Sequence, residues 1–176
     1  MKRHLALIGF MAAGKSTIGR RLARELGWAF FDTDAFVVRA HGTVAAIFDR
    51  EGEAAFRRYE HEAIAHVLAG PIGGVIALGG GALTLVENRA MLAAHAHRVF
   101  LKASPEQIFA RVRRNRKRRP LLGERPTIER IRELYEARLA DYSAVDHIVE
   151  ARKMSDREVL DDILQWLRKN EIALQC

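Results

Sequence analysis

Cysteine is almost absent from this 176-residue chain, because its one cysteine, Cys176, is the last residue. A single thiol cannot close a disulfide within the chain, so a cytoplasmic location is the simplest expectation. The chain also has no apolar run near the roughly 20 residues that a membrane-spanning helix needs, and we expect no membrane partner. An apolar segment at 4–8 reads directly as a strand, which leaves no room for a signal peptide before it.

Acidic residues are in the minority, with 22 Asp and Glu against 29 Lys and Arg and a net charge of +7. Seven of the basic residues lie in the segment 111–119, which has no acidic residue, and the other 22 equal the acidic ones in number. Such a local cluster indicates phosphate capture, polyanion binding or a solvated loop. Because no aromatic residue is interleaved in this segment to stack on bases, we expect no nucleic-acid partner. We also expect the protein to be a monomer.

A phosphate-binding loop is the most specific feature that the chain does have. The sequence GFMAAGKS at 9–16 matches the pattern G-x-x-x-x-G-K-[ST] at each fixed position. The glycines permit a tight turn whose N–H groups point at phosphate oxygens. Lys15 supplies a cation for the outer phosphates, and Ser16 supplies a hydroxyl ligand for Mg²⁺. An apolar strand before the loop and an amphipathic helix at 17–26 give it the context that the motif requires.

Apolar strands alternate with helical stretches along the rest of the chain, which predicts a parallel sheet covered by helices in one domain, 1–176. The predicted strands are 4–8, 28–31, 75–78, 98–101 and 146–149. Further helices are predicted at 84–95, after a cap at Ser104, at 127–141 and after a cap at Ser155. A helical insertion at about 35–69, broken near Gly42 and Gly52, separates the second strand from the third.

Informative residues follow three of these strands, at the edge where open parallel sheets bind ligands. The phosphate loop follows the first strand, and Asp32 and Asp34 follow the second. One carboxylate can help to hold Mg²⁺, with Asp32 the better candidate, and the other can hold or deprotonate an acceptor hydroxyl. The alternative is a capped turn. Gly79-Gly80-Gly81 after the third strand is either a loose loop or a place where backbone N–H groups approach a ligand.

Arg57, in the helical insertion, precedes Glu60 by three residues, so the carboxylate can orient the guanidinium from the same helix face. An oriented arginine can grip a carboxylate through two parallel hydrogen bonds, whereas the alternative is a surface charge. The nearby pair His61 and His66 is not a zinc motif, because its histidines are five residues apart rather than four.

Taken in order, these segments resemble the shikimate kinase family over nearly the whole chain. The resemblance is carried by GFMAAGKST at 9–17, FDTD at 31–34, FRRYE at 56–60, LGGGA at 78–82, RPLL at 119–122 and LYEAR at 134–138. It implies a P-loop α/β fold of three layers, similar to nucleoside monophosphate kinases, with a five-stranded parallel sheet in the order 2-3-1-4-5. It also implies ATP-dependent phosphorylation of the 3-hydroxyl of shikimate, on the route to chorismate and the aromatic amino acids, with Mg²⁺ as cofactor.

The resemblance assigns a role to each matching residue. It implies that catalysis rests on Lys15, Asp34 as the candidate base, and Arg119 of a lid at about 112–125. It places shikimate against Asp34, the backbone of the triple glycine and, through the carboxylate, Arg57 and Arg138. Ser16 and Asp32 would serve Mg²⁺. The nucleotide would be held by Arg119, by Arg111 (or Arg113) on the adenine side, and by the loop residues Gly9, Ala12, Ala13, Gly14, Lys15, Ser16 and Thr17.

Two other functions stay open at this point. One is a different small-molecule acid kinase on the same fold, such as a gluconate kinase, and the other is a non-catalytic ligand-binding module of shikimate-kinase type. The chain departs from the family in two details. The segment 138–142 lacks a proline often found there, and the basic run is about one residue longer. Neither departure removes a chemical group that the reaction needs.

Overall fold

The computed structural model describes the chain except for residues 1, 72, 116–117, 152–153 and 173–176. The expectations about Cys176 and about the Arg116-Lys117 part of the basic run therefore lie outside the described residues. Among the residues that are described, no helix is long and apolar enough to cross a membrane.

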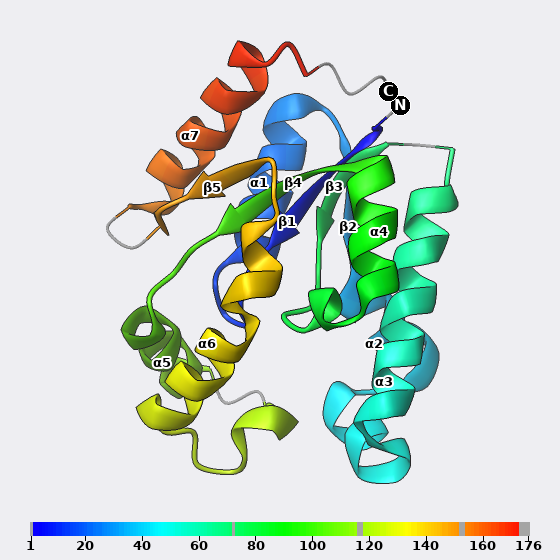
Figure 1. Cartoon of the computed structure of the whole chain (residues 1–176), viewed down its shortest axis with the longest axis vertical. Helices are drawn as coiled ribbons and strands as arrows, with labels where there is room; N and C mark the ends of the chain where they lie inside the picture. The colour runs from blue at the N-terminus through cyan, green and yellow to red at the C-terminus, as the bar shows by residue number, and fades with distance from the viewer. Residues whose placement is uncertain (1, 72, 116–117, 152–153, 173–176) are drawn as a thin grey trace.

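One parallel sheet of five strands forms the centre of the molecule, in the order β2-β3-β1-β4-β5 (Figure 1). This confirms the fold that the resemblance implied. The strands are β1 (His4–Ile8), β2 (Ala29–Asp32), β3 (Gly74–Ala77), β4 (Ala96–Leu101) and β5 (His147–Val149). The α-helices are α1 (Lys15–Leu26), α2 (Thr33–His41), α3 (Val44–Ala69), α4 (Val86–His95), α5 (Pro105–Arg114), α6 (Ile128–Ser143) and α7 (Asp156–Lys169). The described residues also include the short 3₁₀ helices η1 (Ala82–Thr84) and η2 (Pro120–Leu122).

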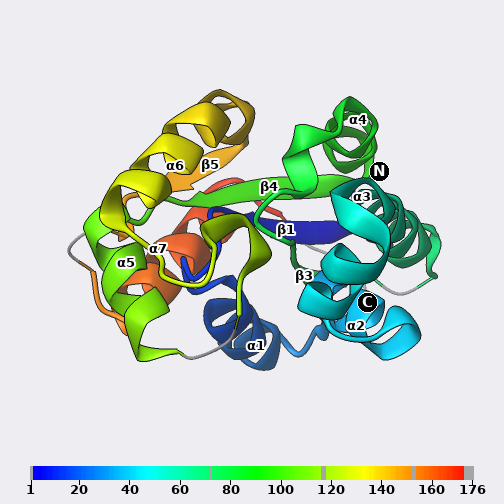
Figure 2. The ribbon, with the colours of Figure 1, turned by 90° about the horizontal axis from the view of Figure 1, so that it is seen from below.

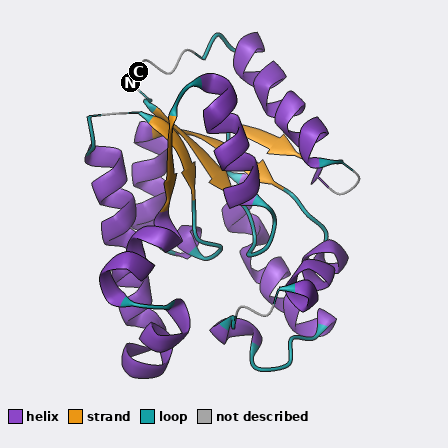
Figure 3. Cartoon of the chain, turned by 180° about the vertical axis from the view of Figure 1, so that it is seen from behind, coloured by secondary structure: helices purple, strands orange, loops and turns teal. Residues whose placement is uncertain are grey.

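Helices cover both faces of the sheet, which gives the molecule three layers (Figures 1 and 3). Because side chains alternate along a strand, β1 serves both faces at once. Leu5 and Leu7 pack in a cluster with α1 and α7, while Ala6 and Ile8 pack in a second cluster with α3, α4, α5 and α6. All five residues of β1 are buried, as expected for the central strand of a covered parallel sheet.

The helical insertion is present where the sequence predicts it. It consists of α2 and α3, and both predicted breaks are confirmed, because Gly42 follows α2 with φ 91° and Gly52 interrupts α3 with φ 81°. Capping boxes at Ser104 and Ser155 begin α5 and α7, also as predicted. These local signals are strong because each satisfies N–H groups that would otherwise lack a partner.

Several predicted boundaries are wrong by one or two residues. β4 begins at Ala96 rather than 98, because Ala96 pairs with His4 of β1 in the sheet. α1 begins at Lys15, two residues earlier than predicted, because Gly14 turns the phosphate loop directly into the helix. The helix predicted at 84–95 is α4, which begins at Val86, two residues later than predicted, and the 3₁₀ helix η1 precedes it.

Candidate active site

A cavity of about 540 Å³ lies beyond the carboxyl ends of the strands, and Figure 2 looks onto this end of the molecule. Its walls come from the phosphate loop, α2, α3, the triple-glycine loop, α6 and the segment that follows α5. The sequence-predicted residues that line it are Ala12, Gly14, Lys15, Ser16, Thr17, Asp32, Asp34, Arg57, Gly80, Gly81, Arg111, Arg119 and Arg138. Gly9, Ala13 and Gly79 are buried behind this lining.

The phosphate loop leaves the start of α1 uncapped. Gly9 has φ 149° and Gly14 has φ 106°, conformations that glycine adopts without strain. No described side chain caps α1, and its first turn contains no acidic residue, unlike α5 and α7. The free N–H groups and the positive end of the helix dipole therefore favour an anion at this point.

Lys15 is buried and held on the loop itself. Its Nζ donates to the carbonyl oxygens of Gly9 at 2.7 Å and Phe10 at 2.9 Å. Burial lowers the pKa of Lys15 to about 8, against the opposing attraction of Asp34 and Asp32. The ammonium group is therefore positioned beside the anion site, and it loses its charge more easily than a lysine in water does.

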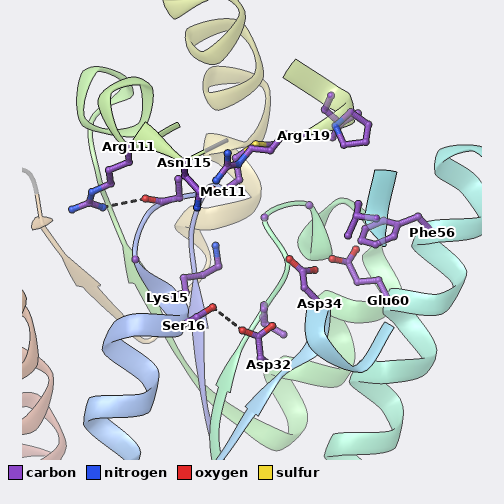
Figure 4. Close-up of a pocket in the computed structure, with 18 of the residues that line it drawn as sticks. Met11, Lys15, Ser16, Asp32, Asp34, Phe56, Glu60, Arg111, Asn115 and Arg119 are labelled. Carbon is purple, nitrogen blue, oxygen red and sulfur yellow. Dashed lines mark hydrogen bonds between the residues drawn. The ribbon is translucent and has the colours of Figure 1, made fainter. Parts of the chain in front are cut away.

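Asp32 combines the two readings that the sequence left open. Its Oδ1 accepts from the N–H of Ala35 at 3.1 Å and so caps α2, while its Oδ2 accepts from Ser16 Oγ at 2.7 Å (Figure 4). A hydroxyl and a carboxylate side by side next to a phosphate site fit Mg²⁺, which prefers oxygen ligands and keeps several waters. No group of three or more His, Cys, Asp or Glu side chains that could hold a metal ion occurs among the described residues.

Asp34 lies in the first turn of α2, and its carboxylate points into the cavity beside Glu60 (Figure 4). Thr33, between the two aspartates, is fully buried. Its Oγ1 accepts from the N–H of Gly79 at 3.1 Å and donates to the carbonyl of Ala77 at 3.4 Å. This threonine ties α2 to the end of β3 and thereby fixes the position of Asp34 relative to the glycine loop. Sequence reasoning assigned Thr33 no role.

Arg57 is oriented by carboxylates of its own helix, as the sequence predicts. Its Nη1 donates to Glu60 Oε2 at 2.7 Å, and its Nη2 donates to Glu53 Oε1 at 2.8 Å. The Arg57 side chain is 9% exposed and that of Glu60 is 0% exposed. The pair with Glu60 is thus buried at the cavity wall, and the reading of Arg57 as a surface charge is wrong.

Close packing around residues 79–81 explains why all three are glycines. None of the three residues has a positive φ. A Cβ at Gly80 would lie 2.7 Å from the backbone nitrogen of Met11, and one at Gly81 would lie 2.5 Å from Arg57 Cζ. Gly79 uses its N–H in the bond to Thr33. The loop therefore lets the side chains and backbone around it approach more closely than any larger residue would allow.

Arg138 and Tyr142 hold the triple-glycine loop from α6. Arg138 Nη1 donates to the carbonyl of Gly80 at 3.2 Å, and the hydroxyl of Tyr142 donates to the same oxygen. Burial raises the pKa of Tyr142 to about 12, so the hydroxyl keeps its proton. Sequence reasoning missed Tyr142, although its place one helical turn after Arg138 puts both side chains on one face.

The basic segment contributes arginines in three different settings. Arg111 Nη1 donates to the carbonyls of Ala12 at 3.1 Å and Ala13 at 2.9 Å. The guanidinium of Arg113 instead lies over the ring of Phe109, 5.6 Å from its centre, so Arg111 is the one that contacts the phosphate loop. Arg119 is half-buried at the cavity, and burial lowers its pKa.

A parallel sheet, a phosphate loop at its middle strand and a cavity with aspartates and arginines define a kinase of the P-loop class. The family model for shikimate kinase matches residues 11–168. A curated shikimate kinase of Pseudomonas entomophila is 43% identical over 169 residues, which cover 95% of this chain and 97% of that protein. One of Geobacter sulfurreducens is 39% identical, with 96% and 93% covered. The chain therefore belongs to the shikimate kinase family.

Solved structures agree with this assignment. The shikimate kinase from Acinetobacter baumannii in complex with shikimate has a TM-score of 0.90 at 32% identity, and the match covers 98% of this chain and 97% of that one. A deoxyadenosine kinase from M. mycoides with bound dATP has a TM-score of 0.59 at 17% identity, with 94% and 99% covered, and shares the fold alone.

Proposed function

We propose that the protein transfers the γ-phosphoryl group of ATP to the 3-hydroxyl of shikimate, giving shikimate 3-phosphate on the route to aromatic amino acids. One observation carries this proposal. The cavity joins an uncapped helix start with a buried lysine to a wall that holds Asp34 and two buried arginines, Arg57 and Arg138. The first part suits a nucleotide triphosphate, and the second suits a small hydroxylated acid.

Phosphoryl transfer requires mainly positioning and stabilisation of charge. The N–H groups of the phosphate loop and Lys15 hold the phosphates, and Arg119 approaches from the lid to balance the charge that spreads over the transferred group. The 3-oxygen attacks the γ-phosphorus in line, and the bond from that phosphorus to the bridging oxygen of ADP breaks. Asp34 orients the hydroxyl and takes its proton late. Arg57 and Arg138 grip the carboxylate of shikimate.

Ser16 and Asp32 would hold Mg²⁺, which would neutralise part of the charge of the phosphates. Arg111 supports the adenine side of the site. The whole chain acts as one domain and as a monomer, with a substrate-binding insertion at about 35–69 and a lid at about 112–125 that closes to exclude water. A cytoplasmic location is supported by the cysteine content, because a single cysteine cannot form a disulfide within the chain.

The release of ADP from MgATP tests the proposal, measured with shikimate, quinate, gluconate and no acceptor. Shikimate-dependent release is expected. Release with gluconate alone would favour the different acid kinase, and no acceptor-dependent release from folded, ATP-binding protein would favour the binding module. The Asp34→Asn protein tests the base separately, because near-normal turnover with intact shikimate binding would contradict that role.

A further inference from the structure

Glu60 lines the cavity beside Asp34, and its only role so far is to orient Arg57. Its side chain is fully buried, and its Oε2 accepts the bond from Arg57. Its Oε1 is also buried and has no hydrogen-bond partner among the described residues. An unsatisfied, buried carboxylate oxygen is unfavourable, so this atom points to an interaction still to be made.

The unpartnered oxygen of Glu60 faces a second carboxylate. A Cβ built at Gly79 would overlap Glu60 Oε1 and lie 2.7 Å from Asp34 Oδ1, so both oxygens border the same small space (Figure 4). Two ionised carboxylates at such a site repel each other, and a proton on one relieves the repulsion. A proton on Glu60 Oε1 also turns an unsatisfied acceptor into a donor directed at Asp34, which stays ionised.

The other charged groups around Glu60 come from α1, α3 and α6. Lys15, Arg57 and Arg138 interact electrostatically with it, and Asp34 faces it from α2. Burial raises the pKa of Glu60 to about 7, with Arg57 lowering it and Asp34 raising it further. The charge state of Glu60 is therefore poised to respond to a new charge that enters the site.

Arg57 already faces two negative charges without any substrate. Its Nε and Nη2 donate to Glu53 Oε1 at 3.2 and 2.8 Å, and its Nη1 donates to Glu60. An acceptor carboxylate at Arg57 and Arg138 brings one more negative charge. Glu53 is 48% exposed, so water screens its charge, whereas Glu60 is fully buried and loses its charge only by taking a proton.

We propose that the acceptor's carboxylate enters the site together with one proton, which Glu60 holds on Oε1. This inference rests on the proposed function, because it requires an acid acceptor at Arg57 and Arg138. Protonation leaves the positive charge of Arg57 available to the acceptor. By linkage, acceptor binding strengthens proton binding at Glu60, and the proton strengthens acceptor binding by the same factor. Acceptor affinity therefore falls as pH rises above 7, where Glu60 of the free protein has lost its proton.

Calorimetric titration of shikimate into nucleotide-free protein tests this inference. A proton taken up on binding comes from the buffer and adds the buffer's heat of ionisation to the binding heat. At pH 7.5, the heats in HEPES and Tris are therefore expected to differ by an amount that corresponds to uptake of about half a proton or more. The Kd of shikimate is expected to rise about tenfold between pH 6.5 and 8.5, because uptake of one proton allows Kd to rise at most about tenfold per pH unit. Equal binding heats in the two buffers would mean that no proton is taken up, and that result would overturn the inference.

Two variants identify the group that takes the proton. Glu60→Gln imitates the protonated side chain, so its shikimate binding is expected to be buffer-independent and flat with pH. The control Glu53→Gln changes the exposed partner of the same arginine and is expected to keep the proton uptake. Uptake that persists in Glu60→Gln would assign the proton to another group, such as Lys15, and overturn the inference.

The wild-type titration decides the question even if Glu60→Gln does not fold. It also separates this inference from the proposed function. Shikimate heat without proton uptake overturns the inference alone. Absence of shikimate heat at every pH, in protein that still binds MgADP, overturns the proposed function and the inference together.

Discussion

In the phosphate loop, the backbone conformation of a single residue, Ala12, is expected to lower the stability of the fold. Ala12 has φ 61°, in the left-handed region, and Arg111 bonds to its carbonyl and to that of Ala13. A residue other than glycine rarely adopts this conformation, because its Cβ crowds the backbone. The loop geometry is thus imposed on Ala12 by its surroundings, with Arg111 supplying a charge-assisted contact from α5.

Ala12→Gly is expected to raise the free energy of unfolding by about 0.5 kcal/mol, because glycine adopts a positive φ without strain. Ala13→Gly is the matched control, since Ala13 has an ordinary negative φ and is buried. This control is expected to lower stability by about 1 kcal/mol, through greater freedom of the unfolded chain and the loss of a buried methyl group. Urea denaturation of both variants checks the difference, and an Ala12→Gly protein less stable than wild type would contradict it.

Lys15 gives the nucleotide site a dependence on alkaline pH. Its pKa in the folded protein is about 8, below the ordinary lysine value of 10.5, so the side chain is charged below pH 8 and neutral above it. We expect kcat/KM for MgATP to fall above pH 8, approaching about tenfold per pH unit as the free enzyme loses the ammonium charge. The contribution of Lys15 to the free energy of unfolding changes in the opposite direction and rises between pH 8 and 10.5. In this range the unfolded chain still binds the proton that the folded protein has lost.

Steady-state kinetics from pH 7 to 9.5 check this prediction. Lys15→Arg is the informative control, because a guanidinium keeps its charge over this range and its residual activity should show no such fall. A flat wild-type profile up to pH 9.5 would show that Lys15 keeps its proton in the free enzyme.

Among the elements, the lid segment places two adjacent arginines in contrasting environments. Arg118 forms an ion pair with Asp49 of α3 in which both side chains are more than half exposed. Arg119 is half-buried and lines the cavity. The chain thus directs one arginine towards the helical insertion and the next towards the proposed phosphates.

Arg119→Ala is expected to lower kcat roughly a hundredfold or more, because an arginine that stabilises transferred phosphoryl charge has effects of this order. Arg118→Ala is the neighbouring control and is expected to change kcat less than about threefold, since exposed ion pairs contribute little. Turnover at saturating MgATP and shikimate measures both. Equal losses in the two variants would contradict the distinction.

The triple-glycine loop is expected to affect acceptor binding, because residues around it approach more closely than a Cβ would allow. A Cβ at Gly81 would lie 2.5 Å from Arg57 Cζ, so Gly81→Ala must push the guanidinium away from its place. The KM of shikimate is expected to rise about tenfold, since such a displacement removes at least one good hydrogen bond, while the KM of MgATP stays the same. Gly70→Ala, at the far end of α3, is the control. A rise in both KM values for Gly81→Ala would indicate a general loss of structure.

At the scale of the whole molecule, the positive charge is expected to serve small anions only. The net charge of +7 comes from one segment, and the remaining basic and acidic residues are equal in number. We expect no measurable binding of duplex DNA at about 150 mM salt, where non-specific binding depends on many phosphate contacts. Fluorescence anisotropy with a labelled duplex measures this. Binding that weakens steeply with salt would instead favour the non-catalytic ligand-binding module.

The sequence predicted local features better than long-range ones. The strands, the two glycine breaks in the insertion and the capping boxes depend on neighbouring residues, and all were found in place. The strand order came only from the family resemblance, because apolar runs do not say which strands pair. Likewise, the start of β4 depends on pairing with β1, and the fit of Gly81 against Arg57 depends on two distant segments meeting.

The strand order also bears on how the protein is made. β1 is synthesised first, yet it lies between β3 and β4, which end at Ala77 and Leu101. At about 5–20 residues per second, the first strand waits several seconds or more on the ribosome for its two partners. Its apolar side chains have no sheet to join during that time. Of the elements that pack on β1, α1 follows it first in the chain, so it can cover Leu5 and Leu7 before the middle of the sheet assembles.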